Sequence, residues 1–169
     1  PAQGFGPPTI AGLESGCVVA FAVEIQTRWQ IAYAFIDDTT AAEPLIRTVG
    51  TPGISNIKPA VDASGTKACV VWESNPDGQR GVFASWLSPA GATPPLLVSH
   101  SEQVSCNPDV AVLDDGRAFA AWDSVRQATA HLYGAWYRDG KWQRPKQLTG
   151  SALIERHVDV VARDSDIWM

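Results

Sequence analysis

The sequence predicts an all-β fold, a β-propeller built from four-stranded antiparallel blades, and three observations support this prediction. Similar segments return about every 50 residues along the 169-residue chain. Each copy holds four short apolar runs separated by turn residues, and no stretch has the length and amphipathic pattern of a helix. A four-stranded unit that repeats with this period is typical of a propeller blade.

Four landmarks keep the copies in register. They are a proline before the first run, an aromatic ending the second, an aromatic inside the third and a proline before the fourth. The landmarks fall at Pro8, Pro59 and Pro108; Phe21, Trp72 and Trp122; Phe35, Trp86 and Trp136; and Pro44, Pro95 and Pro145. The offset is 51 residues between the first two copies and 49 or 50 between the next two. We therefore expect blades at about 7–55, 56–104 and 105–154, with an incomplete fourth at 155–169.

Each apolar run is predicted to be a strand, and the third copy shows the pattern best. Its runs are PDVAV, AFAAW, HLYGAWY and RPKQL, at 108–112, 118–122, 131–137 and 144–148. Asp-Gly pairs at 115–116 and 139–140 predict hairpins, because glycine accepts the positive φ of tight turns. The second run is apolar at consecutive positions, which predicts a strand buried on both faces.

The charge and composition of the chain limit the classes of partner that we expect. The net charge is −5, and no cluster of lysine and arginine occurs, so neither nucleic acid nor an anionic membrane is the expected partner. The longest apolar run, at 17–23, is too short to span a bilayer. The chain begins at Pro1 rather than Met, and we expect a secreted or periplasmic protein from which any signal peptide has already been removed.

Three cysteines, Cys17, Cys69 and Cys106, cannot all pair within one chain. Buried structural thiols are the favoured interpretation, and one disulfide with one free thiol is the alternative. No cysteine or histidine spacing indicates a metal site, and no glycine-rich phosphate loop is present. We expect neither a metal nor a cofactor.

Three blades and part of a fourth do not close a ring, since propellers have roughly 4–8 blades. We expect these residues to belong to a larger ring of six to eight blades whose other blades come from the same chain. The alternative is that further chains complete the ring.

The segment Tyr137–Trp142, YRDGKW, approximates the Asp-x-Gly-x-x-Trp hairpin of the sialidase-like, Asp-box-related (BNR) propellers, with one residue fewer between Asp and Gly. Together with the strand pattern, the chain resembles these propellers along essentially its whole length. The resemblance implies a binding face built from two kinds of loop. One kind precedes the first strand of each blade, and the other joins the second strand to the third.

Glu73 and Asp123 occupy the same position of successive copies on that face, each directly after a tryptophan and before a serine. One interpretation is a ring of carboxylates that accepts hydrogen bonds from sugar hydroxyls or serves as general acid and base. The alternative is that each carboxylate accepts backbone N–H groups in the turn that follows it. The first copy has Ala22 here, so the carboxylate is not obligatory.

Asn107, Glu155, Arg156 and His157 lie in the segments that precede first strands, and we include them with the two carboxylates as candidate ligand-binding residues. The triplet 155–157 departs most clearly from the repeat and could bind an anionic group at the mouth of the channel. The alternative is a solvated loop of mixed charge.

The resemblance to sialidase-like propellers implies a test for sialidase chemistry. That chemistry needs an arginine cluster, a tyrosine nucleophile with a glutamate, and an aspartate acid/base. No Arg-Ile-Pro segment occurs, and the tyrosines are predicted in third strands, away from the channel. We assign no catalytic residue. The expected function is a non-catalytic propeller that binds a glycan or protein ligand. The alternatives are a segment of a sialidase-like glycoside hydrolase and a structural subunit of a larger assembly.

Overall fold

A computed structural model describes residues 4–39, 43–51, 53–75, 78, 80–100, 102–126, 129–151 and 153–169. These residues form three large antiparallel sheets and one hairpin, and they contain no helix. No helix among them is therefore long and apolar enough to cross a membrane. The predicted all-β architecture of four-stranded blades is confirmed.

The sheets follow one another in chain order, and we number them as blades 1 to 4. Blade 1 has the order β1 (Thr9–Gly12), β2 (Cys17–Ile25), β3 (Arg28–Ile36) and β4 (Arg47–Val49). Blade 2 contains β5 (Asn56–Ser64), β6 (Lys67–Ser74), β7 (Gly81–Ser88), β8 (Gly91–Ala92) and β9 (Leu96–Leu97). Blade 3 contains β10 (Val104–Val112), β11 (Ala118–Arg126), β12 (Thr129–Arg138), β13 (Lys141–Trp142) and β14 (Lys146–Gln147). Blade 4 is the hairpin β15 (Val161–Arg163) and β16 (Asp166–Trp168).

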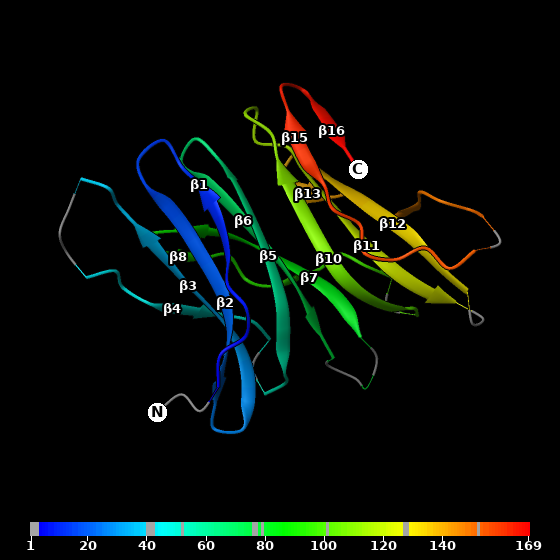
Figure 1. The fold of residues 1–169 in the computed structure, drawn as a ribbon, viewed down its shortest axis with the longest axis horizontal. Coiled ribbons are helices and arrows are strands. Elements are labelled where there is room, and N and C mark those ends of the chain that lie inside the picture. The colour runs from blue at the N-terminus through cyan, green and yellow to red at the C-terminus, as the bar shows by residue number, and fades with distance from the viewer. Residues whose placement is uncertain are drawn as a thin grey trace.

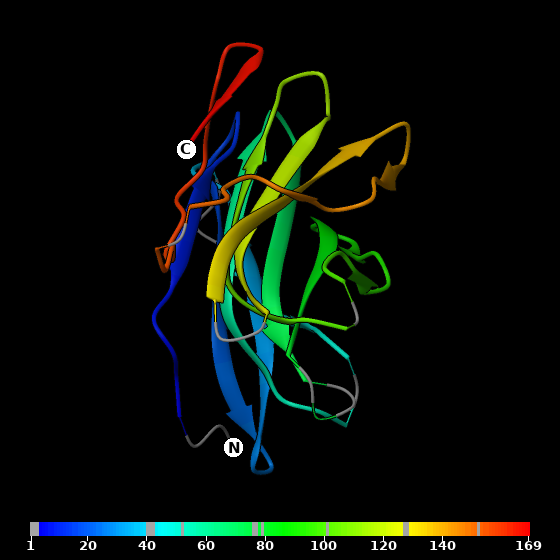
Figure 2. The ribbon, with the colours of Figure 1, turned by 90° about the vertical axis from the view of Figure 1, so that its right-hand side faces the viewer.

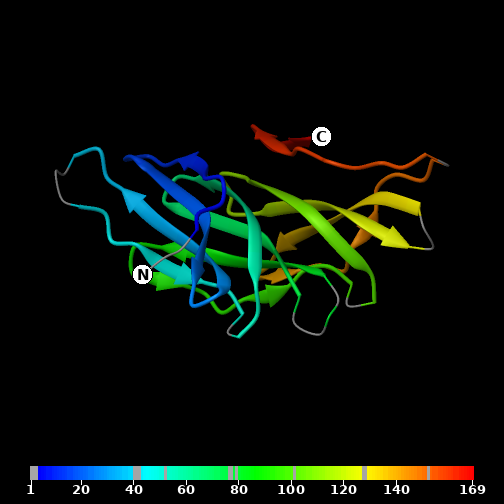
Figure 3. The same ribbon diagram turned by 60° about the horizontal axis from the view of Figure 1, so that its bottom comes forward.

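The first strands of the blades, β1, β5, β10 and β15, lie next to one another, and we call them the inner strands (Figure 1). Figure 2 shows blue β1 and the red hairpin of blade 4 along one side, with the outer strands of blades 2 and 3 on the other. Figure 3 shows the blades succeeding one another from blue β2 and β3 to yellow β11 and β12.

The predicted Asp-Gly turn is confirmed, whereas Pro59 and Pro108 lie inside β5 and β10, at their register shifts, and not ahead of these strands as predicted. Asp139 and Gly140 have φ values of 53° and 76° and form the two-residue turn between β12 and β13. Such a turn matches the natural twist of paired strands. The fourth strand is split around Pro94–Pro95 in blade 2 and around Pro145 in blade 3, because proline has no N–H for the ladder.

Trp72 of β6 and Trp122 of β11 are the centres of the contacts between blades. Trp72 is fully buried in a cluster with Val18 and Ile31 of blade 1, and Trp122 is buried with Val71 and Val82 of blade 2. Alternate residues of β6 thus face the blade before and the blade after. This arrangement confirms that the continuous apolar run is a strand buried on both faces.

The three cysteines carry free thiols, and Cys69 and Cys106 are buried, as expected for structural thiols. Cys69 packs within the apolar cluster between blades 2 and 3. Burial raises the pKa of the Cys69 thiol, so it stays protonated and unreactive.

Candidate functional site

The candidate site is organised by irregularities in the inner strands. The register of β5 against β6 shifts between Ile57 and Ala60, and that of β10 against β11 shifts between Cys106 and Asp109. Within these bulges Lys58 and Asn107 adopt φ values of 50° and 49°. His157 has a φ of 62° at the matching place ahead of β15. A bulge redirects the side chain and the N–H of the extra residue, and it is common beside functional sites.

Glu73 joins blades 2 and 3 at the first of these bulges. Its side chain is only 1% exposed, and its Oε1 accepts the backbone N–H of Asn107 at 2.8 Å. The Lys58 ammonium lies 3.0 Å from the same oxygen, and the Arg80 guanidinium lies 3.6 Å from Oε2. The Asn107 N–H and the two cations replace part of the water that the buried carboxylate has lost, while its Oε2 accepts no hydrogen bond from the described residues.

Asp123 repeats this arrangement one blade later. Its Oδ1 accepts the backbone N–H of His157 at 2.8 Å, and its Oδ2 accepts the side-chain amide of Asn107 at 2.6 Å. Lys58 Nζ donates to Asn107 Oδ1 at 2.7 Å. The residues Lys58, Glu73, Asn107, Asp123 and His157 therefore form one continuous set of hydrogen bonds across three inner strands, which we call the bulge network.

The structure thus brings four of the six predicted site residues together, and it changes the expected role of two. Both carboxylates cap backbone N–H groups, but the donors lie in the inner strand of the next blade, not in the following turn. Each second strand ends beside the start of the next inner strand, so the nearest unpaired donor belongs to the neighbouring blade. The carboxylates lie behind Lys58 and Asn107, out of direct reach of a ligand.

Glu155 is separated from the two residues that follow it. His131 Nδ1 of β12 lies 3.2 Å from its Oε2, and its backbone N–H donates to the carbonyl of Ala130. Hydrogen bonds, chiefly from Thr149 and also from His131, lower the pKa of Glu155. Arg156 and His157 are exposed. The predicted triplet therefore divides into an acid that binds the third strand and two side chains at the surface.

Two cations were missed as site residues. Lys58 and Arg80 have side chains that are 52% and 50% exposed and that rest on the buried Glu73 carboxylate. Lys58 was identifiable from the repeat, since it occupies the position of Asn107 and His157. Arg80 lies in the loop before β7, and no pattern in the sequence marked it.

The tyrosines lie where the sequence placed them, in third strands. Tyr33 is buried between blades 1 and 2, and Tyr133 donates to Gln147 Oε1 of β14 at 3.0 Å. Among the described residues, no group of three or more His, Cys, Asp or Glu side chains is arranged to hold a metal ion.

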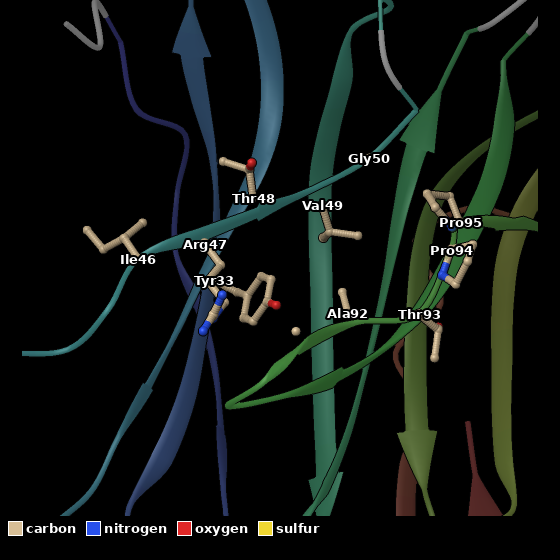
Figure 4. A pocket seen from close by; sticks show the side chains of 11 residues that line it. Tyr33, Ile46, Arg47, Thr48, Val49, Gly50, Ala92, Thr93, Pro94 and Pro95 are labelled. Atoms are coloured by element: carbon tan, nitrogen blue, oxygen red, sulfur yellow. The ribbon is translucent and has the colours of Figure 1, made fainter.

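A concave region lies at the outer edges of blades 1 and 2, away from the bulge network. It is a cavity of about 590 Å³ between β4 and the segment 91–95 (Figure 4). Figure 4 shows Tyr33 and Arg47 at one end and Pro94 and Pro95 at the other. Arg47 Nε donates to the carbonyl of Pro89 at 3.1 Å and so connects the two blades. Burial raises the pKa of Tyr33, against the opposing charge of Arg47.

Solved structures share this fold. An endo-arabinase from Bacteroides thetaiotaomicron superposes with a TM-score of 0.60 at 15% sequence identity, over 88% of this chain and 63% of the arabinase chain. A subtype N10 neuraminidase-like protein of A/little yellow-shouldered bat/Guatemala superposes with a TM-score of 0.59 at 11% identity, over 93% of this chain and 51% of the other. This chain spans less than two thirds of either. No protein-family model and no curated protein matches the sequence. At these identities the likeness establishes the β-propeller fold.

Proposed function

We propose that this protein is a non-catalytic, sialidase-like propeller that binds a glycan on the face formed by the bulge network. The observation that carries the proposal is the way Lys58 is held. Its ammonium donates to Asn107 Oδ1 at 2.7 Å and forms an ion pair with Glu73 Oε1 at 3.0 Å, so two contacts fix its position and N–H donors remain for a ligand.

The side chains exposed around Lys58 are chiefly donors. Arg80 is an exposed cation that pairs with the same Glu73 carboxylate, Arg156 is an exposed cation next to His157 in the chain, and the carboxylates of this network are buried beneath the surface. Sugar hydroxyl and carboxylate oxygens are acceptors that suit such donors, and guanidinium groups bind carboxylates bidentately. Donors held in place by buried partners bind with little further loss of side-chain entropy.

We include the absence of catalysis in the proposal because the Glu73 and Asp123 carboxylates are buried and contact donors of the protein itself. Glycoside hydrolysis generally needs two carboxyl groups that flank the scissile bond and reach the substrate. Glu73 and Asp123 are buried, Glu73 accepts the Asn107 N–H and Asp123 accepts hydrogen bonds from two blades, so neither is placed to protonate or attack a sugar.

The test is a glycan array followed by titration of the bound glycans with wild-type protein and Lys58→Asn. Asparagine suits the positive φ, as Asn107 shows at the same repeat position, so the variant removes the ammonium and keeps the backbone. Affinity should fall about tenfold, as for loss of a hydrogen bond from a charged donor. Lys67→Asn, exposed at the opposite end of β6, should bind as wild type. Equal glycan affinity in all three proteins would show that the bulge network is not part of the glycan site.

A sialidase-like glycoside hydrolase is the second candidate, and the likeness to an arabinase and a neuraminidase-like protein favours it. Release of reducing sugar from the glycans that bind would establish it in place of the non-catalytic proposal.

A protein ligand or a structural subunit is the third candidate. It is favoured by exposed apolar residues in and just before the outer strands, namely Leu45, Ile46, Leu96 and Leu97. Export to the periplasm or the medium remains a prediction, and fractionation of the producing cells tests it.

A further inference from the structure

The first junction between successive blades lacks two acids that the other two junctions share, and Ala22 occupies one of these two positions. Ala22 pairs with Ile31 in blade 1, as Glu73 pairs with Val82 in blade 2 and Asp123 with Leu132 in blade 3. At the second and third junctions the carboxylate accepts the bulge N–H of the next inner strand. At the first junction the methyl group of Ala22 replaces that carboxylate.

A cavity of about 380 Å³ lies where the carboxylate is missing. We call it the junction cavity. Its lining is mostly apolar and consists of Gly6, Pro7, Pro8, Ala22, Trp29, Ile57, Lys58 and Pro59. This volume lies within the range of small-molecule sites, which reach from about 300 to 1,000 Å³.

The donor that the carboxylate would satisfy is still present. Lys58 has a φ of 50°, against 49° for Asn107 and 62° for His157, so its N–H is aimed toward the neighbouring blade in the same way. Among the described residues, no side chain and no carbonyl outside the strands accepts the Lys58 N–H, and Lys58 has no partner in the register of β5 against β6. The donor is therefore available to an oxygen atom that comes from outside the chain.

The walls are arranged to keep the space open. A Cβ on Gly6 would lie 3.2 Å from the Ala22 methyl group, so glycine at this position preserves the gap. The Trp29 ring lies against the segment at Gly4, where an added Cβ would be 3.3 Å away. Pro7 stands at the repeat position of Lys58 and Asn107 and brings no polar side chain of its own.

We propose that the junction cavity is a binding site for a small organic carboxylate. The ligand carboxylate accepts the Lys58 N–H in the way that Glu73 and Asp123 accept their donors. The apolar part of the ligand lies against Trp29 and the prolines. An anion is favoured over a neutral acceptor because both equivalent positions hold an anion in this same molecule. The site is distinct from the glycan face, since it uses the backbone of Lys58 and not its ammonium group.

Benzoate is the probe, because its ring fits an apolar wall and its charge resides on two acceptor oxygens. Titration calorimetry of the protein with benzoate should show saturable binding of one molecule per chain. Benzyl alcohol, which lacks the charge, should bind about tenfold more weakly, as expected for loss of a charged acceptor. No saturable binding of benzoate, or equal binding of the two compounds, would overturn the proposal.

Ala22→Glu places a carboxylate of the chain in the cavity, as Glu73 does in blade 2, and should weaken benzoate binding by about tenfold or more. Thr66→Glu, exposed in the turn at the far end of β5, makes the same change of charge and should leave the binding unchanged. If Ala22→Glu does not fold, Trp29→Ala is the second variant. It removes a half-buried ring from the wall of the junction cavity and should also weaken benzoate binding. Wild-type affinity in the folded variants would place benzoate elsewhere.

Lys58→Asn separates this proposal from the glycan proposal. It keeps the backbone N–H, so it should retain benzoate binding even where it loses glycan binding. Loss of benzoate binding in a folded Lys58→Asn variant would show that the ammonium, and not the N–H, holds the anion.

Discussion

The junction between blades 1 and 2 and the junction between blades 2 and 3 have similar apolar interiors and different inner edges. Trp72 and Trp122 occupy equivalent places in the two apolar clusters. Between blades 2 and 3 the inner edge also carries carboxylates that cross the junction, since half-buried Asp62 accepts the Val112 N–H at 2.7 Å and buried Glu73 accepts that of Asn107. Blade 1 has Ala11 and Ala22 at the corresponding positions.

Both junctions share the apolar packing, and blades 1 and 2 are also joined by polar contacts such as the one from Arg47 to Pro89, while the carboxylates determine what space remains at the inner edge. Where a carboxylate is present, the bulge N–H of the next blade is used within the fold. Where it is absent, the same N–H borders a cavity.

The largest effect should come from the feature that the junctions share. Trp72→Ala and Trp122→Ala each remove a fully buried indole, and each should lower the free energy of unfolding by about 3–5 kcal/mol. Urea denaturation measures both. A much smaller loss for Trp72→Ala would show that the first junction does not depend on apolar packing and would break the comparison.

A smaller loss should follow removal of one inner carboxylate. Asp123→Ala leaves the His157 N–H and the Asn107 amide without their acceptor and should cost about 2–3 kcal/mol. Asp123→Asn keeps an acceptor and should cost less. The matching test at the first junction is Ala22→Glu, which should cost little or raise stability. A cost for Ala22→Glu equal to that of Asp123→Ala would contradict the assigned equivalence of the two positions.

The pH dependence of the free energy of unfolding should show the contribution of Asp62. Burial raises its pKa, with the Val112 N–H opposing, so the folded protein keeps this proton to a higher pH than the unfolded chain. The stabilising contribution is present below the unfolded value of about 3.9 and is lost as the pH rises through the folded value. Asp62→Asn should therefore gain stability relative to wild type as the pH rises over this interval.

Asp115→Asn provides the control of opposite sign. Hydrogen bonds from the backbone and side chain of Arg117 lower the pKa of Asp115, so its contribution is present above the unfolded value and is lost as the pH falls. The Asp115→Asn variant should lose stability relative to wild type as the pH rises. Urea denaturation at several pH values measures both variants, and the same sign in both would contradict the assignment.

The smallest effect on stability should come from Lys58→Asn. The Lys58 ammonium is half-exposed, so water can replace it, and the buried Glu73 carboxylate keeps the Asn107 N–H and the Arg80 guanidinium, so the loss should be about 1 kcal/mol. An asparagine amide can also donate to Glu73, as Asn107 does to Asp123. A loss within about 1 kcal/mol would leave glycan affinity as the main property that this side chain controls. Urea denaturation measures this loss, and a cost as large as that of Asp123→Ala would show that Glu73 depends on the ammonium.

The sequence alone determined the blade period, the strands and the tryptophans of the junctions, because these depend on local alternation and on spacing that every copy repeats. It also located Glu73, Asp123, Asn107 and His157 at one end of the blades. The direction in which Glu73 and Asp123 turn was decided by the docking of blades, since their N–H donors lie 34 residues further along the chain. The pairing of Glu155 with His131 and the cavity beside Ala22 were decided in the same way. Contacts across a junction depend on how two sheets pack, and no periodicity within one sheet records that.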